Sequence, residues 1–186
     1  ATRFGLEVQL AEVTGLEANE RHWTVHTYDG DVSARAVIVA GGSTLRKLGV
    51  PGEEELHGAG VSYCATCDGA FFMGQVVGVV GGGDSALDEA LVLTEFATKV
   101  IMFHRRERFR GQKVLQDRVL SHPKIEVRWN TVVEAVLGEA QVEGVSITDV
   151  VTGEPSRVDL SGIFIYVGLE PNTQYLQDVL ELDNAG

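Results

Sequence analysis

Cysteine is scarce in this chain, which has only Cys64 and Cys67 among its 186 residues. Two cysteines cannot make the disulfide framework of a small secreted domain, so a cytoplasmic, reducing location is the default expectation. A structural zinc site would need further thiolates or a Cys2His2 spacing, and neither is evident. We therefore predict no metal site, and each cysteine has only the other as a possible disulfide partner.

Basic residues are also few, with 15 Lys and Arg against 27 Asp and Glu and a formal net charge of -12. This acidic balance argues against nucleic-acid binding, which usually needs a basic face. No apolar run approaches the roughly 20 residues of a membrane-spanning helix, so we expect no membrane segment. A chain of 186 residues is long enough for one full domain and part of another.

The first 43 residues show the alternation that is typical of strands. Apolar positions alternate over 6–13 and again over 23–28, and an Asp-Gly turn signal leads from there into a third run. That run ends in the apolar residues 36–40 and stops at Gly41-Gly42. We predict a β-meander that leads into a buried strand.

Residues 44–60 hold a Pro-Gly pair, three consecutive glutamates and several glycines, a composition that predicts a linker or hinge. Beyond it, short apolar runs alternate with stretches of helical spacing. We expect strands over 75–81, 99–104 and 125–129, a tight loop over 82–85, and helices over 86–93 and around 112–121. This βαβαβ order predicts a parallel sheet with helices on its faces.

Three more strands, over 131–137, 142–151 and 156–167, are expected to form a second β-meander. The fold class that follows is α/β. It consists of a Rossmann-like nucleotide-binding domain, built from the parallel sheet and this meander, together with part of a second domain that the first meander begins.

The segment Gly81-Gly-Gly83-Asp-Ser-Ala86 fits the pattern G-x-G-x-x-A between an expected strand and an expected helix. The first glycine permits the tight turn, the second lets the backbone approach a pyrophosphate, and the small Ala86 lets helix and strand pack closely. Phosphates would rest on free amides at the helix N-terminus, which Asp84 or Ser85 can cap. A glycine-rich turn without a ligand is the alternative, and the flanking elements favour nucleotide binding. The candidate contacts are Gly81, Gly82, Gly83, Asp84 and Ser85.

The residues after the next expected strand distinguish the two nicotinamide cofactors. An acid there usually binds the ribose 2′-hydroxyl of NADH, but this position reads Phe103-His-Arg-Arg106 and has none. Arg105 and Arg106 can grip a 2′-phosphate with paired donors, and Arg110 can close the other side. A solvated charged turn is the alternative. The place of the cluster at a strand end favours NADPH over NADH.

The pattern Cys64-Ala-Thr-Cys67-Asp68 allows two interpretations once zinc is set aside. The cysteines can be an inert core pair, or they can be a dithiol/disulfide redox pair, because two intervening residues let the sulfurs bond. Asp68 follows directly. A carboxyl group there can take or hand over a proton during thiol–disulfide exchange, and it can equally cap a helix or turn.

Three short motifs together carry a resemblance to a known family. Cys-Ala-Thr-Cys-Asp-Gly, Gly-Gly-Gly-Asp-Ser-Ala and His-Arg-Arg-x-x-Phe-Arg occur in this order. The chain resembles the bacterial-type, low-molecular-weight thioredoxin reductases over about residues 36–175. The motifs are highly specific in combination, although none is specific alone.

The resemblance implies a function. In that family electrons pass from NADPH to FAD, then to the Cys-x-x-Cys disulfide, and then to thioredoxin. It implies that Cys64 and Cys67 are the redox pair and that Asp68 is the proton donor. It also implies that the NADPH 2′-phosphate is surrounded by His104, Arg105, Arg106 and Arg110. Members are usually homodimers. Their domains alternate between two arrangements, and 44–60 and 168–173 match the hinge strands of that motion.

The chain departs from the family pattern in two respects. The family usually has Ala-Thr-Gly at a flavin turn where this chain has Ala40-Gly-Gly42, so Gly41 and Gly42 are candidate FAD contacts that lack one hydroxyl. A glycine-rich flavin fingerprint before residue 75 and the closing Gly-Asp flavin segment are both missing. We therefore expect a fragment. Its parts are a partial FAD-binding domain over 1–43, an NADPH-binding domain with the Cys-x-x-Cys motif over 44–170, and the start of the return to the FAD-binding domain over 171–186.

Two further possibilities remain open from the sequence. The intact protein can act on another disulfide or dithiol, as a peroxiredoxin partner or a dithiol oxidase does. The chain can also be an NADP-binding module that is inactive when isolated. We expect no turnover by the flavin-free chain, because hydride transfer to a disulfide needs the flavin as an intermediary.

Overall fold

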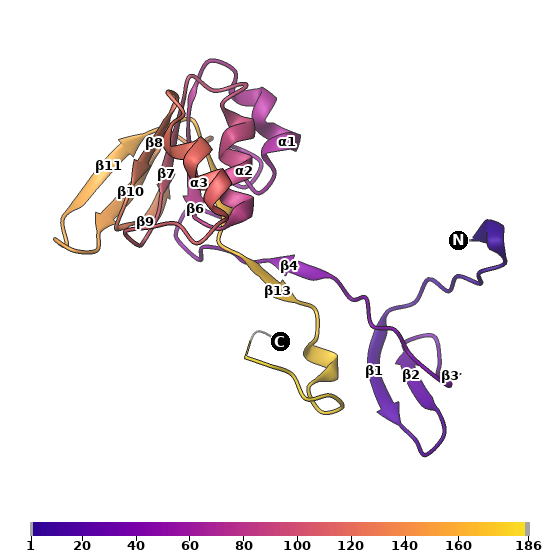
Figure 1. Cartoon of the computed structure of the whole chain (residues 1–186). Coiled ribbons are helices and arrows are strands. Elements are labelled where there is room, and N and C mark those ends of the chain that lie inside the picture. The colour runs from indigo at the N-terminus through magenta and orange to yellow at the C-terminus, as the bar shows by residue number, and fades with distance from the viewer. Residues whose placement is uncertain (1, 185–186) are drawn as a thin grey trace. The chain divides into compact units, whose positions relative to one another are not determined.

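The computed structural model describes residues 2–184, which form two compact units (Figure 1). One unit is built from the residues before Leu45 together with those after Gly168, and the other spans Leu45–Gly168. The predicted domain boundaries, after residues 43 and 170, lie close to the positions at which the chain passes from one unit to the other. The assignment of the units to FAD and NADPH stays a prediction.

The smaller unit contains a three-stranded antiparallel sheet in the order β1-β2-β3. Its strands are β1 (Val13–Ala18), β2 (Trp23–Thr27) and β3 (Val32–Ala34), and it also has the 3-10 helices η1 (Thr2–Phe4) and η3 (Gln174–Leu176). The turn before β3 uses Gly30 at φ 125°, a left-handed conformation that favours glycine. The predicted meander exists, although its first strand begins at Val13.

Two predicted strand segments of this unit are wrong. Residues 6–10 and 36–40 have no regular structure, and Leu10 and Ile38 are each 93% exposed. A strand is stable only when its backbone pairs with a neighbour, and none of residues 2–184 pairs with either segment. Alternation along the chain identified residues suited to a strand, but it carried no information about whether a partner strand is present.

The chain passes between the units through two strands that pair with each other. These are β4 (Ser43–Leu45) and β13 (Leu169–Pro171), which form a two-stranded sheet. β13 lies within 168–173 and β4 overlaps the start of 44–60, the two segments that the resemblance matches to hinge strands. Motion about them stays a prediction.

The larger unit is built on a five-stranded parallel sheet in the order β5-β12-β6-β7-β8. Its strands are β5 (Val61–Ser62), β6 (Val76–Gly81), β7 (Lys99–Phe103), β8 (Ile125–Arg128) and β12 (Gly162–Tyr166). Its helices are α1 (Ala65–Asp68), the 3-10 helix η2 (Gly69–Phe72), α2 (Asp84–Leu93) and α3 (Lys113–Leu120). The predicted α/β fold and the βαβαβ order are confirmed.

An antiparallel sheet in the order β11-β10-β9 completes this unit. Its strands are β9 (Thr131–Leu137), β10 (Gly144–Asp149) and β11 (Pro155–Asp159). The single strand predicted over 156–167 is wrong, because the chain changes sheet after Asp159 and enters the parallel sheet at Gly162 as β12. A Cβ at Gly162 would collide with the Phe72 ring, so glycine is required where the chain makes this change.

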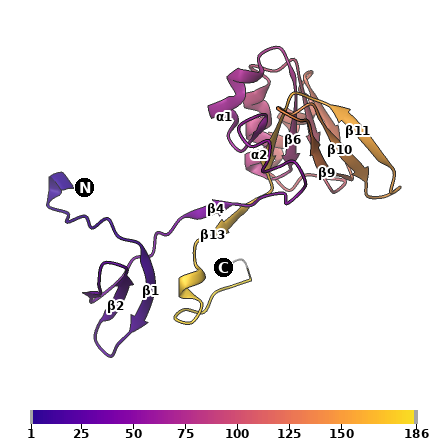
Figure 2. The ribbon, with the colours of Figure 1, turned by 180° about the vertical axis from the view of Figure 1, so that it is seen from behind.

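The parallel sheet is covered on both faces, by the helices on one side and by the β9–β11 sheet on the other (Figures 1 and 2). Strand β6 shows why its sequence is apolar at every position. Val77 and Val79 pack into the core under the helices, and Val80 packs into the core under the antiparallel sheet. A parallel strand buried on both faces is expected to be continuously hydrophobic.

Residues 51–60, predicted as part of a linker, instead form ordered turns of the larger unit around a buried carboxylate. Glu53 is only 1% exposed. Its carboxylate accepts hydrogen bonds from the amides of Leu48 (2.8 Å) and Gly49 (2.6 Å) and from the Tyr63 hydroxyl (2.8 Å). Burial alone would raise the pKa of Glu53, but these donors outweigh it and hold the pKa below its ordinary value of 4.5.

We expect Glu53→Gln to lower the free energy of unfolding by about 2 kcal/mol at pH 7, because the amide loses charge-assisted hydrogen bonds. The pKa of Glu53 is lower in the folded state, so its contribution is present above pH 4.5 and is lost as the pH falls through the folded value. The difference between wild type and variant in urea unfolding should therefore shrink below pH 4.5. The exposed Glu54, replaced by Gln, is the control and should cost about 0.5 kcal/mol or less. Equal effects at both positions would contradict the assignment.

Candidate active site

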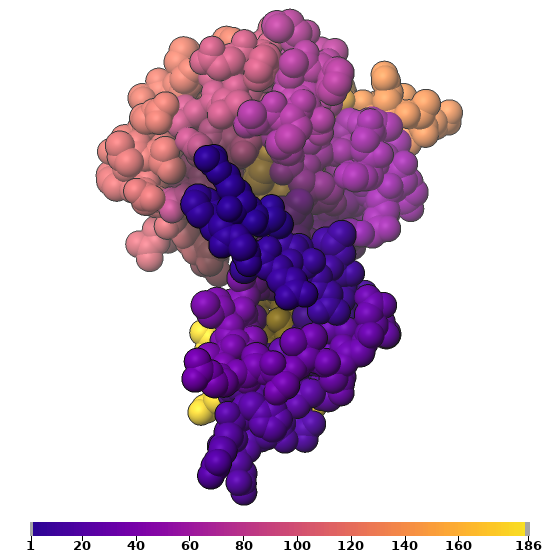
Figure 3. Space-filling view, turned by 90° about the vertical axis from the view of Figure 1, so that its right-hand side faces the viewer, coloured from indigo at the N-terminus to yellow at the C-terminus, as the bar shows by residue number. Residues whose placement is uncertain are grey.

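The two cysteines form a disulfide at the start of α1. Cys64 is the N-cap residue and is half-buried, whereas Cys67 lies one turn later and is exposed. The Cys67 amide donates a hydrogen bond to Sγ of Cys64 at 3.2 Å. The α1–α2 region, in magenta, lies at the surface of the larger unit on the face shown in Figure 3. A bonded pair with one exposed cysteine is disfavoured as an inert core pair and is suited to thiol–disulfide exchange, in which a thiolate attacks the S–S bond.

Asp68 ends α1 directly beside this disulfide, and its carboxylate faces a buried hydroxyl. The Ser62 hydroxyl, on β5, donates to Oδ2 of Asp68 at 2.6 Å. Asp68 also stands at the N-cap position of η2 but makes no capping hydrogen bond with its side chain. The alternative role of this side chain as a cap is therefore not observed, and its role in proton transfer stays a prediction.

Glu89 and Tyr166 hold the other side of the same turn, and the sequence analysis missed both. The Ala65 amide donates to Oε2 of Glu89 at 3.0 Å and to the Tyr166 hydroxyl at 2.8 Å. Burial raises the pKa of Tyr166, and the neighbouring Glu89 carboxylate raises it further, so the phenol keeps its proton. Glu89 lies on α2 and Tyr166 ends β12, so only the folded sheet brings them to the disulfide turn.

The loop after β6 has the geometry that a dinucleotide loop needs. Gly81 has φ 149°, and a Cβ there would lie 2.5 Å from the Tyr166 carbonyl oxygen and 2.7 Å from Cβ of Ala86. Gly83 faces open space, with no atom within 4 Å of a Cβ built on it. It is also the N-cap of α2 and provides no capping side chain, so the predicted cap by Asp84 or Ser85 is wrong. The first amides of α2 are left accessible to an anion.

The Asp84 carboxylate instead joins the dinucleotide loop to the loop after β7. Its Oδ1 accepts a hydrogen bond from the Gln112 amide at 2.6 Å. The Gly82 carbonyl accepts two more from that loop, from the amides of Arg110 (2.8 Å) and Gly111 (3.1 Å). The dinucleotide loop and the arginine-rich loop therefore form one continuous hydrogen-bonded surface.

His104, predicted to lie around a phosphate, is instead buried between the two loops. It is 6% exposed, with Nδ1 at 3.0 Å from the Gly81 carbonyl oxygen and Nε2 at 2.9 Å from that of Arg108. A Cβ on Gly82 would collide with the imidazole, which explains the middle glycine of the motif. Both ring nitrogens face carbonyl groups, so His104 braces the site and has no free nitrogen to offer a phosphate.

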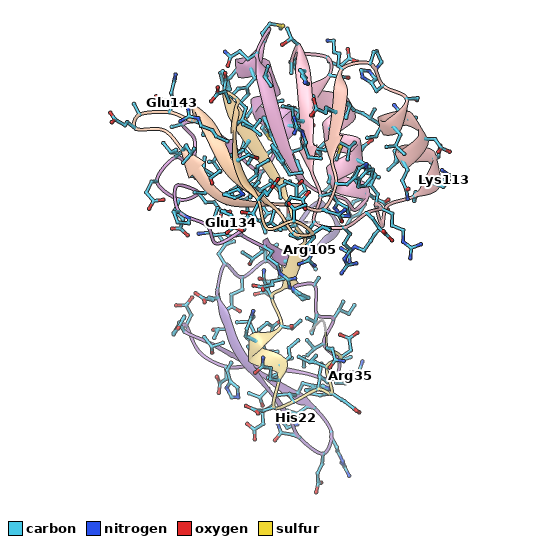
Figure 4. All side chains as sticks on the ribbon, turned by 90° about the vertical axis from the view of Figure 1, so that its left-hand side faces the viewer. His22, Arg35, Arg105, Lys113, Glu134 and Glu143 are labelled. Carbon is cyan, nitrogen blue, oxygen red and sulfur yellow. A yellow bond between two sulfur atoms is a disulfide. The ribbon has the colours of Figure 1, made fainter. Side chains whose placement is uncertain are left out.

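The three candidate arginines remain available at the same edge of the sheet. Arg105, Arg106 and Arg110 are exposed, and none of them pairs with a carboxylate in the described part of the chain. Figure 4 labels Arg105 in the loop after β7 and Lys113 at the start of α3. Unpaired guanidinium groups beside an accessible helix N-terminus suit an anionic ligand with several phosphates.

The candidate flavin contacts lie in the smaller unit. The side-chain amide of Asn172 donates to the Gly41 carbonyl at 3.0 Å, and its backbone amide donates to the Gly42 carbonyl at 3.1 Å. Gly41 lines a pocket of about 610 Å³ whose other walls include Val37, Val39 and Tyr175. These contacts define a cavity, and its occupation by FAD stays a prediction.

Residues 2–184 contain neither a metal-binding cluster of side chains nor a membrane-spanning helix. No group of three or more His, Cys, Asp or Glu side chains is placed to hold a metal ion. No helix in this range has both the length and the apolar composition needed to cross a membrane.

Comparison with known proteins adds the family. A model described as pyridine nucleotide-disulphide oxidoreductase matches residues 2–186. The chain is 44% identical to a thioredoxin reductase of Treponema pallidum over 186 residues, which is 100% of this chain and 60% of the relative. It is also 44% identical to a thioredoxin reductase of Bacillus subtilis over 172 residues, or 92% of this chain and 54% of the relative. The chain thus spans about 60% of the length of the curated relatives that it matches in full.

Solved structures agree with this similarity. The thioredoxin reductase of Lactococcus lactis has a TM-score of 0.88 and 42% identity, over 95% of this chain and 58% of that one. The thioredoxin reductase of T. acidophilum has a TM-score of 0.86 and 33% identity, over the same shares of 95% and 58%.

The buried position of His104 between the two loops predicts that its pKa is lower than that of an exposed histidine. Burial is the main cause that lowers the pKa of His104, and the charges of Arg106 and Arg105 lower it further, against the opposing effect of the two carbonyl groups. We expect the imidazole to titrate below its ordinary value of 6.5 in a histidine NMR titration, with the signal assigned by its loss in His104→Gln. Stability should then fall as the pH is lowered from 6.5, because the unfolded state binds the proton more tightly. A midpoint above 6.5 would show that the carbonyl groups hold an imidazolium.

Proposed function

The chain belongs to the pyridine nucleotide-disulphide oxidoreductase family, and from this premise we propose that it is the NADPH-binding and disulfide-bearing part of a thioredoxin reductase. The intact enzyme would pass electrons from NADPH through FAD to the Cys64–Cys67 disulfide and on to thioredoxin. The observation that carries the proposal is the exposed disulfide with Asp68 beside it, in the same unit as the dinucleotide loop.

The residues of the larger unit fit NADPH. The open space at Gly83 and the uncapped start of α2 would receive the pyrophosphate. Arg105, Arg106 and Arg110 would bind the 2′-phosphate, while His104 and Asp84 keep the two loops together. No acid stands at the end of β7 to favour a free 2′-hydroxyl.

The disulfide residues fit electron transfer to a protein disulfide. A bound flavin would accept the hydride of NADPH and pass its electrons to the disulfide, a chemistry that side chains cannot provide. Gly41 and Gly42 would form part of its site in the smaller unit. Once Cys64 and Cys67 are thiols, the Cys67 amide can stabilise a thiolate on Cys64, and Asp68 can exchange a proton with the leaving sulfur.

Thioredoxin, or a thioredoxin-like protein, is the proposed partner. In support, a relative from Mycobacterium leprae that is 43% identical is a bifunctional thioredoxin reductase/thioredoxin. We also propose that the intact protein is a homodimer, on the resemblance to the family, and that it is cytoplasmic, on its scarcity of cysteine. Another disulfide substrate is the alternative, and a substrate panel on the intact protein separates the two.

Replacement of Cys67 by Ser in the intact protein should abolish NADPH-dependent thioredoxin reduction, because a single thiol cannot complete the exchange. Reduction of the flavin by NADPH should remain, since it precedes the disulfide. Stopped-flow absorbance of the flavin and a thioredoxin-coupled assay measure the two steps separately. Full thioredoxin turnover by the variant would disprove the cysteine assignment, and turnover only with other disulfides would favour the alternative substrate.

The loop that carries Arg105, Arg106 and Arg110 predicts that this chain prefers NADPH to NADH. By calorimetry, NADPH should bind about 10- to 100-fold more tightly than NADH, since charge-assisted hydrogen bonds to the 2′-phosphate contribute about 1.5–3 kcal/mol. Arg105→Ala combined with Arg106→Ala should remove most of this preference, since only Arg110 is left to bind the 2′-phosphate, and should leave NADH affinity unchanged. Arg157→Ala, on β11, removes the same kind of charge outside the loop and should leave both affinities unchanged. Equal affinity of the wild type for both cofactors would contradict the assignment.

A further inference from the structure

We propose that Ser62 is a positioning residue for proton transfer at the disulfide, through its hydrogen bond to Asp68. The inference deepens the proposed function and rests on it, because it needs Cys64 and Cys67 to exchange with a substrate disulfide. Ser62 belongs to none of the three sequence motifs. Its side chain is 4% exposed, and its contact with Asp68 is seen only in the folded chain.

The hydroxyl of Ser62 has one hydrogen, and its surroundings decide where that hydrogen points. Oδ2 of Asp68 lies at 2.6 Å, and the Cys64 carbonyl oxygen lies at 3.4 Å. A charged acceptor at the shorter distance takes the stronger bond, so the hydroxyl donates to Asp68. The Cys64 amide donates in turn to Oγ of Ser62 at 3.1 Å. A single side chain thus joins the carboxylate to the backbone of the first cysteine.

The backbone that carries Ser62 is held independently of this hydrogen bond. Ser62 lies on β5, in parallel register opposite Phe164 of β12. Asp68 is fixed from its other side as well, since its amide donates to the Cys64 carbonyl at 3.1 Å. The hydroxyl therefore sets the direction of the carboxylate on a turn that is already formed. In the described part of the chain, Oδ1 of Asp68 has no hydrogen-bond partner, so this oxygen is left to exchange a proton.

The step that depends on this geometry is the release of the substrate thiol. One thiolate of the reduced pair attacks a substrate sulfur, so a mixed disulfide forms and the substrate S–S bond breaks. The departing sulfur takes a proton from Asp68, which had received it from a cysteine thiol. The second cysteine then attacks the mixed disulfide, restores the Cys64–Cys67 bond and releases the second thiol. Two cysteine thiols are oxidised, one substrate disulfide is reduced, and two protons pass to the products.

The release of a substrate thiol that needs no proton should not depend on proton transfer from Asp68. An aromatic disulfide, 5,5′-dithiobis(2-nitrobenzoate), releases a weakly basic thiolate, whereas oxidised glutathione releases a basic one that must be protonated. The ratio of the two exchange rates therefore reports proton delivery, because attack by the cysteine thiolate is common to both. A merely structural effect of a substitution on the turn would slow both reactions alike.

The experiment uses the reduced chain, freed of reductant, in single-turnover mixing with each disulfide. We expect Ser62→Ala to slow exchange with oxidised glutathione roughly tenfold relative to the aromatic disulfide, and Asp68→Asn to do so roughly a hundredfold. Ser62→Thr keeps the hydroxyl and should restore the wild-type ratio. Thr94→Val is the matched control, since it removes a buried hydroxyl that donates to the Leu91 carbonyl and lies outside the disulfide turn. It should leave the ratio unchanged.

A double variant completes the test. If Ser62 acts through Asp68, then adding Ser62→Ala to Asp68→Asn should change the ratio no further. An equal slowing of both disulfides by Ser62→Ala, or multiplying effects in the double variant, would overturn the inference. The assay contains no NADPH, flavin or thioredoxin, so the proposed function is tested apart. If the reduced wild-type chain exchanges with neither disulfide, the proposed function is contradicted. If it exchanges normally but Ser62→Ala leaves the rate ratio unchanged, only this inference is contradicted.

Discussion

The parallel pairing of β12 with β6 is the constraint on which the candidate site depends. This register places Tyr166 opposite Gly81, at the ends of the two strands. The Tyr166 carbonyl then leaves no room for a Cβ at Gly81, and the Tyr166 hydroxyl binds the Ala65 amide in the disulfide turn. One residue therefore contacts both the dinucleotide loop and the redox turn. A shift of register would separate the two halves of the site, since side chains alternate between faces with a period of two.

Buried polar side chains also join separate turns and loops at other points of the larger unit. Glu53 organises the turns before β5, His104 braces two loops, and Ser62 connects Asp68 to the disulfide. Each is nearly or fully satisfied by named partners, as buried polar groups need to be. The charged side chains around the site therefore differ in whether they have partners. Within residues 2–184, Arg105, Arg106 and Arg110 pair with no carboxylate, while the carboxylates of Asp68 and Glu89 near the disulfide accept hydrogen bonds.

Some of this could be predicted from the sequence because the signal is local. A continuously apolar β6 followed by Gly81 and a helical repeat predicts a strand, a turn and a helix, and the structure has all three. Strands over 6–10 and 36–40 could not be judged in this way, since a strand also requires a partner that lies elsewhere in the chain. The change of sheet between Asp159 and Gly162 was missed for the same reason. It depends on the Phe72 ring, which packs where a Cβ would have to stand.

The candidate chemistry could be predicted from the chain alone: two cysteines with an adjacent acid, a glycine loop before a helix, and arginines in place of an acid at a strand end. These are properties of residue type and spacing along one stretch of chain, so they can be recognised without the fold. The groups that surround these residues became known from the folded chain. Ser62, Glu89 and Tyr166 come from β5, α2 and β12, and they meet at one turn because the parallel sheet brings its strand ends to one edge. The structure likewise assigned His104 to bracing, because two carbonyl groups from separate loops occupy its ring nitrogens.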